Sequence, residues 1–245
     1  SSFHKRAARS GTSPINNQSS LITCNLRGDP VALAERRDFG SNRGQERGND
    51  VEFDLMTGSS TWASAGDLAR RVEDQGFSGM LYTETGQVPW MQIAAAAMAA
   101  PSLTFTTGIA VAFPRSPMVS AQVAWELAGE TNGKFRLGLG SQVKGHVVRR
   151  YSSDFDRPAR RLLDYVMAVK ACLRAFRGEE RLSHEGEFYN LSLLPDSWKP
   201  RSHDFGDIKV DISSVGPLMN NVAGQIADGV HVHPMHSMHY IENRL

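Results

Sequence analysis

The sequence predicts an α/β fold built on a parallel sheet. From residue 51 onward, apolar stretches typical of buried strands alternate with segments whose apolar residues have helical spacing. The stretches at 103–112 and 134–140 each end in a polar loop that contains Gly or Pro, and an Ala-rich helical segment lies between them. Strand–loop–helix–strand units of this kind build parallel sheets, whose sites lie at the carboxyl ends of the strands.

Three strand–helix pairs make up the first half of this regular region. Val51–Thr57 alternates as a strand does, and apolar residues recur with helical spacing from Ala65 to Val72, followed by Gly76 as a helix stop. Pro101 ends the second helical segment, and Pro117 suits the first turn of the third. The predicted strands are 51–57, 79–84 and 103–112, and the predicted helices are 64–75, 91–100 and 118–130.

The second half continues the alternation after one interruption. A strand at 134–140 leads to a long amphipathic helix at 158–177, on which Leu162, Val166 and Val169 share a face. Residues 178–206 contain turn residues and few strand signals, so they are expected to form an excursion from the series. The remaining predicted elements are a strand at 209–215, a helix at 217–227, a strand at 228–233 and a short helix near 237–244.

Six β/α units at this spacing favour a TIM-type (β/α)8 barrel over an open sheet. A closed barrel has eight strands, so the sequence predicts an incomplete barrel of about six units. The outer strands, 51–57 and 228–233, are then expected to have unpaired edges. Either the chain is a fragment or a partner covers the gap, and an open edge favours a homo-oligomer.

Composition excludes several functional classes. The chain has 245 residues, a formal net charge of +1 and a pI of about 7.9, so no general attraction to nucleic acid or to an acidic membrane is expected. No apolar run reaches the roughly 18–20 residues that span a bilayer. The two cysteines, Cys24 and Cys172, form no disulfide framework and suit a reducing cytoplasm.

Residues 1–50 differ from the rest of the chain. They are rich in Ser, Asn, Gly and Arg, with one short apolar patch at Leu21 to Leu26, and they carry eight Lys and Arg against five Asp and Glu. This composition predicts a disordered or unrelated leader, and it contains no apolar core of a secretory signal. A basic nucleic-acid arm is the alternative, but interleaved aromatic residues are missing. The predicted domain is therefore residues 51–245.

Four stretches of the regular region resemble the luciferase-like monooxygenase superfamily, which includes bacterial luciferase and deazaflavin-dependent oxidoreductases. They occur in the expected order and span nearly the whole region. The variants AFPRSP and GSQVKGH look most like the deazaflavin-using branch. The stretches are LARRVEDQGFSG leading into LYTET (68–85), TGIAVAFPRSPM with AQVAWELA (107–128), FRLGLGSQVKGH (135–146), and GEFY, VGPLM and AGQIADGV (186–230).

The resemblance implies a (β/α)8 barrel that binds a cofactor at the carboxyl-end mouth of its strands. It implies flavin mononucleotide (FMN) or the deazaflavin coenzyme F420 as that cofactor, and hence hydride transfer or flavin-type oxygenation. A small organic molecule is the expected substrate. Many relatives have a His close to Glu84, where this chain has the loop Gly86-Gln-Val-Pro-Trp.

The resemblance also implies site residues at the ends of the second and third strands. Thr83, Glu84 and Thr85 are expected beside the ring or the substrate, and Glu84 is expected to act as acid or base if burial raises its pKa. Ala110, Val111 and Ala112 are small enough for a planar ring to approach the backbone, at a place where the family often has a backbone kink, sometimes a non-proline cis peptide. Arg115 is expected to contact an anionic group of cofactor or substrate. The alternatives are a surface carboxylate, barrel packing and a solvated arginine.

Further candidates follow the later strands. Gly138 and Gly140 allow close approach, and Ser141 and Gln142 offer hydrogen bonds to a ring edge or ribityl chain. His146, Arg149 and Arg150 are expected to meet a polyanionic tail, or else to belong to a polar loop over the mouth. Gly216 and Pro217 form a close-approach turn at the cofactor or a helix start. The site residues are thus Glu84 as the catalytic group, Thr83, Thr85, Ala110, Val111, Ala112, Gly140, Ser141, Gln142 and Gly216 at the cofactor, and Arg115, His146 and His233 at the substrate or tail.

A histidine run near the end of the chain raises the question of a metal site. On a strand, His231 and His233 face the same way, and His236 and His239 follow. Neither a carboxylate nor a cysteine is placed to complete a zinc or iron site, so no metal is expected. His233 is expected to line the barrel mouth instead.

The sequence therefore predicts an oxidoreductase that uses coenzyme F420 for hydride transfer to or from a small organic substrate. An FMN-dependent luciferase-like monooxygenase is the first alternative. A non-catalytic, incomplete barrel that serves only in association is the second. Phosphate anchoring in such barrels often uses the loops of the seventh and eighth units, which this chain lacks on this reading.

Overall fold

A computed structural model describes residues 21–26, 51–233 and 235–244 of the chain. The strands are β1 (Leu21–Leu26), β2 (Val51–Thr57), β3 (Gly79–Tyr82), β4 (Thr104–Thr107), β5 (Ala110–Val111), β6 (Phe135–Gly140), β7 (His184–Glu185), β8 (Asn190–Leu191), β9 (Lys209–Ser214) and β10 (Gly229–Val232). The helices are α1 (Trp62–Asp74), α2 (Trp90–Ala99), α3 (Pro117–Glu130), α4 (Lys144–Arg149), α5 (Pro158–Phe176), α6 (Pro217–Ile226) and α7 (Met238–Arg244), and Asp196–Trp198 is a 3-10 turn, η2.

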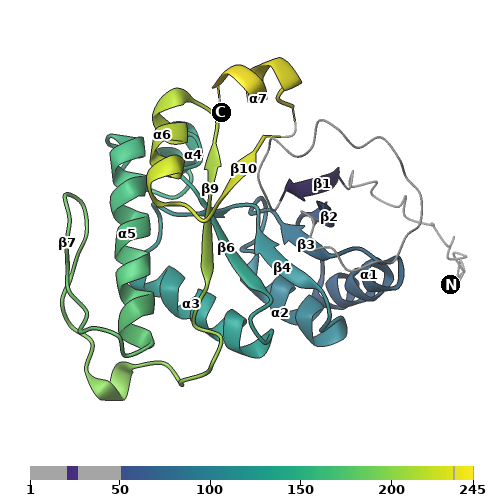
Figure 1. Ribbon diagram of the computed structural model, residues 1–245, viewed down its shortest axis with the longest axis horizontal. Helices are drawn as coiled ribbons and strands as arrows, with labels where there is room; N and C mark the ends of the chain where they lie inside the picture. The colour runs from purple at the N-terminus through teal and green to yellow at the C-terminus, as the bar shows by residue number, and fades with distance from the viewer. Residues whose placement is uncertain (1–20, 27–50, 234, 245) are drawn as a thin grey trace, which may run out of the picture.

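The main sheet is a curled, parallel half-barrel, as the sequence predicts. Its strand order is β1-β2-β3-β4-β6-β9-β10, and the short β5 continues the line of β4 and also pairs with β6. Every pair from β2 to β10 in this order is parallel. The helices α1, α2, α3 and α5 lie along the outside of the curl (Figure 1). The fold is therefore α/β, with six of the strand positions of a TIM-type barrel.

Most predicted elements begin and end within one or two residues of the observed ones. The helix ends follow known capping chemistry: Thr61 accepts a hydrogen bond from the backbone N–H of Ser64, and Ser116 accepts one from Met118 ahead of α3. One strand prediction was wrong. Residues 103–112 do not form a single strand but divide into β4 and β5, and the peptide bond between Gly108 and Ile109 is cis.

The outer edge of β2 also differs from the prediction. We expected this edge to be unpaired, but Leu21–Leu26 forms β1 and pairs with it in antiparallel register, with Leu21 opposite Met56 and Leu26 opposite Val51. At the other side, β9 is the only strand of the described residues that pairs with β10. The rest of the predicted leader, residues 1–20 and 27–50, lies outside the described residues.

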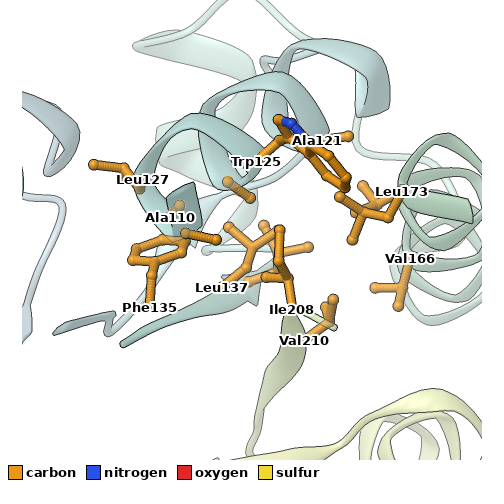
Figure 2. Packing of buried hydrophobic residues seen from close by; sticks show 14 of the residues in the cluster. Ala110, Ala121, Trp125, Leu127, Phe135, Leu137, Val166, Leu173, Ile208 and Val210 are labelled. Atoms are coloured by element: carbon orange, nitrogen blue, oxygen red, sulfur yellow. The ribbon is translucent and has the colours of Figure 1, made fainter. Parts of the chain in front are cut away.

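The core fills the space between the sheet and its helices. Leu137 of β6 and Val210 of β9 are completely buried on the helix-facing side of the sheet. Figure 2 shows Ala121 and Trp125 of α3 and Val166 and Leu173 of α5 converging on these two side chains. Because one layer of helices holds this side of the sheet, the carboxyl ends of β3, β5 and β6 are fixed relative to one another.

Two short elements were not predicted. The excursion at 178–206 contains a β7–β8 hairpin and η2, and the polar loop after β6 contains α4. Asp164 of α5 holds the hairpin: it accepts hydrogen bonds from the backbone N–H groups of Phe188 at 2.6 Å and Tyr189 at 3.1 Å, and its other oxygen lies 2.7 Å from Nε2 of His184. One carboxylate therefore fixes β7 and the turn between β7 and β8 to the helix.

We expect Asp164→Asn to loosen this hairpin without unfolding the sheet. The amide replaces a charged acceptor of backbone N–H groups, a kind of bond that contributes about 1.5–3 kcal/mol. Hydrogen exchange at Phe188 and Tyr189 should then accelerate by about tenfold or more, since 1.4 kcal/mol corresponds to a factor of ten. The amide of Val210, which donates to Asp228 at 2.8 Å, is the internal control and should keep its rate. Equal acceleration at all three amides would contradict the local role.

Candidate active site

The sequence-predicted site residues of β3, β5 and β6 meet at one end of the sheet. Thr83–Thr85 follow β3 directly, Ala110–Ala112 contain β5, and Gly140–Gln142 end β6. Val111 pairs with Gly140, and the amide of Ala112 donates to the carbonyl of Gly140 at 3.0 Å. The three segments therefore form one continuous surface at the carboxyl ends of parallel strands, where sites of this architecture lie.

Glu84 is the best-connected side chain of this surface. Its carboxylate accepts two hydrogen bonds from the guanidinium of Arg115, at 2.8 and 2.6 Å, and a third from the backbone N–H of Val111 at 2.8 Å. The Glu84 side chain is 2% exposed and that of Arg115 is 15% exposed. Arg115 also donates to the carbonyl of Val111 at 2.7 Å. The ion pair thus ties the end of β3 to β5 and to the start of α3.

Two residues of the segment after α4 complete this arrangement: Arg150, which was predicted to meet a polyanionic tail, and Tyr151, which was not predicted. The phenol of Tyr151 donates to Oε1 of Glu84 at 3.4 Å, and the guanidinium of Arg150 donates to the carbonyl of Thr85. Arg150 also lies over the ring of Tyr151, 5.2 Å from its centroid. Burial, and then the charge of Glu84, raise the pKa of the Tyr151 phenol. No local sequence pattern marks Tyr151, because its partner lies 67 residues earlier.

A second side of the surface is made of small residues. Ala110, Val111 and Ala112 are buried, and Gly140 lies so close to β9 that a Cβ there would be 2.5 Å from Oγ of Ser213. Ser141 and Gln142 follow and are half-buried. Gln142 has a φ of 58° and accepts a hydrogen bond from the amide of Val143, which leaves the two N–H bonds of its own side-chain amide for another partner.

The other predicted site residues differ in their burial and in the residues that they contact. Thr83 is half-buried and its hydroxyl donates to the carbonyl of Thr57 at 3.2 Å, whereas the side chain of Thr85 is exposed. His146 is exposed on α4. Gly216 precedes the first residue of α6. His233 is exposed beyond β10, and it contacts Met235 and His236 rather than Glu84 or Gly140.

A separate polar cluster lies on the inner side of the curl. Arg136 of β6 forms two hydrogen bonds with Asp211 of β9, one of them 2.8 Å long, and Nε2 of His231 lies 3.7 Å from Asp211. Burial lowers the pKa of His231, with Asp211 opposing the shift and Arg136 adding to it. The imidazole is therefore neutral near pH 7, and its Nε2 has no hydrogen-bond partner among the described residues.

This histidine should make stability depend on pH. An unfolded His has a pKa near 6.5, whereas folded His231 binds its proton only at lower pH. The unfolded chain therefore binds more protons as the pH falls below 6.5, and the free energy of unfolding must decrease in that range. Urea unfolding between about pH 8 and pH 5 should show a smaller decrease for His231→Gln than for the parent. An identical slope for both proteins would contradict the assignment.

The histidines after β9 do not gather into a cluster of metal-ligating side chains in the part of the chain that the structure describes. Among the described residues, no group of three or more His, Cys, Asp or Glu side chains is placed to hold a metal ion. His233 and His236 lie 5.8 Å apart between ring centroids, and His236 stacks on Tyr240 instead. Burial raises the pKa of the Cys172 thiol to about 12, so this cysteine is not a ready ligand or nucleophile. Within residues 21–26, 51–233 and 235–244, no helix is long and apolar enough to cross a membrane.

Comparison with known proteins identifies the family to which this chain belongs. Residues 48–244 match the sequence profile described as luciferase-like monooxygenase. The chain belongs to the luciferase-like monooxygenase family. The matched region begins just before β2 and includes all the strands and helices from β2 to α7.

Individual proteins are similar to this chain in sequence or in fold. An uncharacterized protein of Mycobacterium tuberculosis, Rv1360, is 36% identical over 179 residues, which cover 73% of this chain and 53% of that protein. The coenzyme F420-dependent tetrahydromethanopterin reductase of Methanopyrus kandleri has a similar structure, with a TM-score of 0.61 and 18% identity over 74% of this chain and 55% of that one. The monooxygenase RslO1 of Streptomyces bottropensis follows with a TM-score of 0.58 and 20% identity over 69% and 52%. The chain spans about half the length of the curated relatives it matches.

Proposed function

We propose that this protein is an oxidoreductase that binds the deazaflavin coenzyme F420 at the mouth formed by β3, β5 and β6 and transfers hydride to or from a small organic substrate. The observation that carries the proposal is the meeting of a buried Glu84–Arg115 pair with the small, buried residues Ala110–Ala112 and Gly140 at the ends of neighbouring strands. The pair is proposed to supply polar groups beside the reacting centre, and the small residues to let a planar ring lie close to the backbone. Family membership and the F420-dependent reductase of similar fold support the choice of cofactor.

The chemistry of the residues present suits the ring of such a cofactor. Ala110, Val111 and Ala112 have small side chains, and Gly140 pairs with Val111, so backbone rather than bulky side chains would border the ring. The side-chain amide of Gln142 keeps two N–H donors for a ring edge or for a ribityl hydroxyl. When bound, the deazaflavin supplies a ring carbon that accepts or donates a hydride. His146 and Gly216 are proposed to contact its tail and ring side, and His233 to contact substrate.

The protein's own contribution is position and the handling of a proton. The Arg115–Glu84 pair and its bonds to Val111 hold β5 in one place, so the ring surface is formed before a ligand arrives. Thr83 and Thr85 flank Glu84 in the chain and are proposed to contact the cofactor. Glu84 is proposed as the acid or base of the reaction, held by its donors in a single orientation.

Direct binding tests the proposal. We expect the fluorescence of oxidised F420 to change on titration with the protein, and excess FMN to compete weakly. Gln142→Ala should weaken F420 binding by about tenfold, the equivalent of one to two hydrogen bonds. Gln122→Ala, an exposed glutamine on α3, serves as the matched control. No fluorescence change, or equal affinities for the two variants, would contradict the placement of the cofactor.

An FMN-dependent monooxygenase is the alternative function on the same surface. The family is described by its monooxygenases, and one protein of similar fold is the monooxygenase RslO1. On this alternative, FMN binds more tightly than F420, and substrate-dependent oxygen consumption follows addition of reduced FMN. If neither cofactor binds and neither supports oxygen consumption, the result would favour a non-catalytic barrel.

We also propose that copies of the chain associate. Among the described residues β10 is the last strand of the sheet, and Val230 and Val232 on one of its faces are 45% and 37% exposed. Unpaired, apolar strand edges favour pairing with another chain. Sedimentation analysis should give a mass above 26.9 kDa that falls on replacing Val230 and Val232 by lysine. A monomeric mass at all concentrations would contradict association.

A further inference from the structure

The β7–β8 hairpin contains a motif that the proposed function does not use. Residues 186–189, with the sequence GEFY, form the turn between β7 and β8, and the hairpin lies alongside α5 (Figure 1). The last of them, Tyr189, is half-buried, and its side chain contacts Arg161 and Tyr165. These two residues lie about one turn apart on the same face of α5. Tyr189 therefore joins the hairpin to two neighbouring side chains of the helix.

The contact with Arg161 leads to the loop after β5. The phenol oxygen of Tyr189 accepts a hydrogen bond from Nε of Arg161 at 3.1 Å. The guanidinium of Arg161 lies over the ring of Phe113, 5.5 Å from its centroid, and also over the ring of Phe188, at 5.4 Å. The Arg161 side chain is 14% exposed and Phe113 is buried. Because cation–π contacts strengthen as the cation loses water, Arg161 links the hairpin firmly to Phe113.

The contact with Tyr165 leads to the start of α3. The rings of Tyr165 and Tyr189 pack edge to face, with their centroids 5.3 Å apart. Tyr165 is completely buried, and its phenol donates to the carbonyl of Ser116, the N-cap residue of α3, at 3.3 Å. The same phenol oxygen lies 2.7 Å from Oγ of Ser120 in the next turn. Tyr165 therefore holds the first turn of α3 against α5.

Both sets of contacts end beside Arg115. Phe113 lies two residues before this arginine, and Ser116 follows it directly. Arg115 donates to both oxygens of Glu84 and to the carbonyl of Val111, so the position of its backbone determines where the ion pair and β5 lie. Coupling between separate parts of a protein is carried by packed side chains and hydrogen bonds of this kind. The hairpin is thus connected to the loop that carries the cation of the candidate site.

We infer that Tyr189 is a positioning residue for the proposed site. It holds the loop at 113–116 in place through Arg161 and Tyr165, and thereby fixes the ion pair and the strand β5 to which that loop is bonded. The part of this inference that concerns ligand affinity rests on the proposed function, because it uses the same cofactor at the same mouth. The part that concerns the loop is tested without any ligand.

The first test measures amide hydrogen exchange in the cofactor-free protein. Tyr189→Leu removes the acceptor of Arg161 and the ring that packs on Tyr165. We expect the amides of Val111 and Arg115, which are hydrogen-bonded within the site, to exchange about tenfold faster or more through local opening of the loop. The amide of Thr104, which donates to the carbonyl of Ser78 at 3.0 Å, is the internal control and should keep its rate.

The pattern of exchange decides between local positioning and a general loss of stability. A general loss accelerates the amide of Thr104 together with those of Val111 and Arg115. No acceleration at Val111 and Arg115, or the same acceleration at all three amides, would therefore overturn the inference.

Further variants grade the effect. Tyr189→Phe keeps the ring contact with Tyr165 but loses the acceptor of Arg161, so its exchange rates should lie between those of the parent and Tyr189→Leu. Asn190→Ala removes an exposed side chain of the next residue in the hairpin and should match the parent. If Tyr189→Leu does not fold, Arg161→Met replaces it, because this variant keeps a long side chain but removes the charge over Phe113. The amide of Arg115 should then exchange faster than in the parent.

The second test measures the affinity for oxidised F420 by fluorescence titration of the parent, Tyr189→Leu and Asn190→Ala. Tyr189→Leu should raise the Kd by about tenfold, because the binding-competent arrangement of the loop is then populated only in part. Asn190→Ala should leave the Kd unchanged. A variant that is less stable but still folded keeps its affinity, so a higher Kd for Tyr189→Leu alone indicates positioning.

The outcomes separate the two proposals. A parent protein that binds no F420 rejects the proposed function, and the exchange rates of Val111 and Arg115 still decide whether the hairpin holds the loop. A parent protein that binds F420 as tightly as Tyr189→Leu does overturns the positioning role alone, even where exchange is faster. Equal increases in Kd for Tyr189→Leu and Asn190→Ala would overturn it as well, since the second variant leaves both sets of contacts in place.

Discussion

Replacing Arg115 by alanine is expected to lower the free energy of unfolding by about 3 kcal/mol or more, the usual result of leaving one partner of a buried ion pair alone. The guanidinium supplies two of the hydrogen bonds to Glu84, whose side chain is 2% exposed. Once the arginine is gone, water has little access to replace those bonds. Urea unfolding of the variant and the parent measures the difference.

Three further variants separate this effect from general damage to the loop. Arg149→Ala removes an exposed arginine of α4 and should change stability by no more than about 0.5 kcal/mol. Arg115→Lys keeps the charge but cannot form the bidentate pair, so it should lie between the parent and Arg115→Ala. Glu84→Gln combined with Arg115→Ala should recover part of the loss, because no unpaired charge remains. A loss for Arg115→Ala as small as that for Arg149→Ala would contradict the importance of the pair.

Gly138→Ala is expected to be at least as disruptive. A Cβ at this position of β6 would lie 1.9 Å from the carbonyl oxygen of Thr107 and 2.6 Å from Nε2 of His231. The hydroxyl of Thr107 both donates to the Gly138 carbonyl, at 2.7 Å, and accepts from its amide, at 2.9 Å. Because backbone cannot move away from the methyl group without breaking these bonds, we expect a loss of about 3 kcal/mol or more.

Gly145→Ala provides the matched control for this substitution. Gly145 lies in α4, and a Cβ there would have no neighbour within 4 Å. Alanine favours the helical conformation by up to about 1 kcal/mol, so the variant should be as stable as the parent or slightly more so. A Gly138→Ala protein that unfolds at the same urea concentration as Gly145→Ala would contradict the close approach of β4 and β6.

The regular elements could be predicted because their signals are local. The alternation of Val51–Thr57, the proline at the start of α3 and the spacing of apolar residues along α5 each lie within one element. The antiparallel β1 could not be predicted in the same way, because its pairing with β2 crosses residues of loop-like composition. The hairpin strands β7 and β8 are two residues each, too short for an alternating pattern, and they are fixed by Asp164 from another element.

The candidate residues of the site could be named from the sequence, but the contacts between them could not. Strand ends, small residues and a carboxylate can be read along the chain, so Glu84, Ala110 and Gly140 could be named as candidates. The bidentate bond between Glu84 and Arg115 joins residues 31 positions apart, and the contact with Tyr151 joins residues 67 apart. Spacing along one chain carries no signal for such contacts, which depend on the curl of the sheet and on the path of the segment after α4.

The most direct test of cofactor binding at this mouth is hydrogen–deuterium exchange of the protein with and without saturating oxidised F420. We expect slower exchange at 83–88, 112–116 and 140–151, the loops at the ends of β3, β5 and β6, and no change along the outer surface of α1. Ligand that binds the native state must protect the backbone that it orders or covers. Protection confined to α1 and α2, or no protection at any segment, would contradict the placement of the cofactor at this mouth.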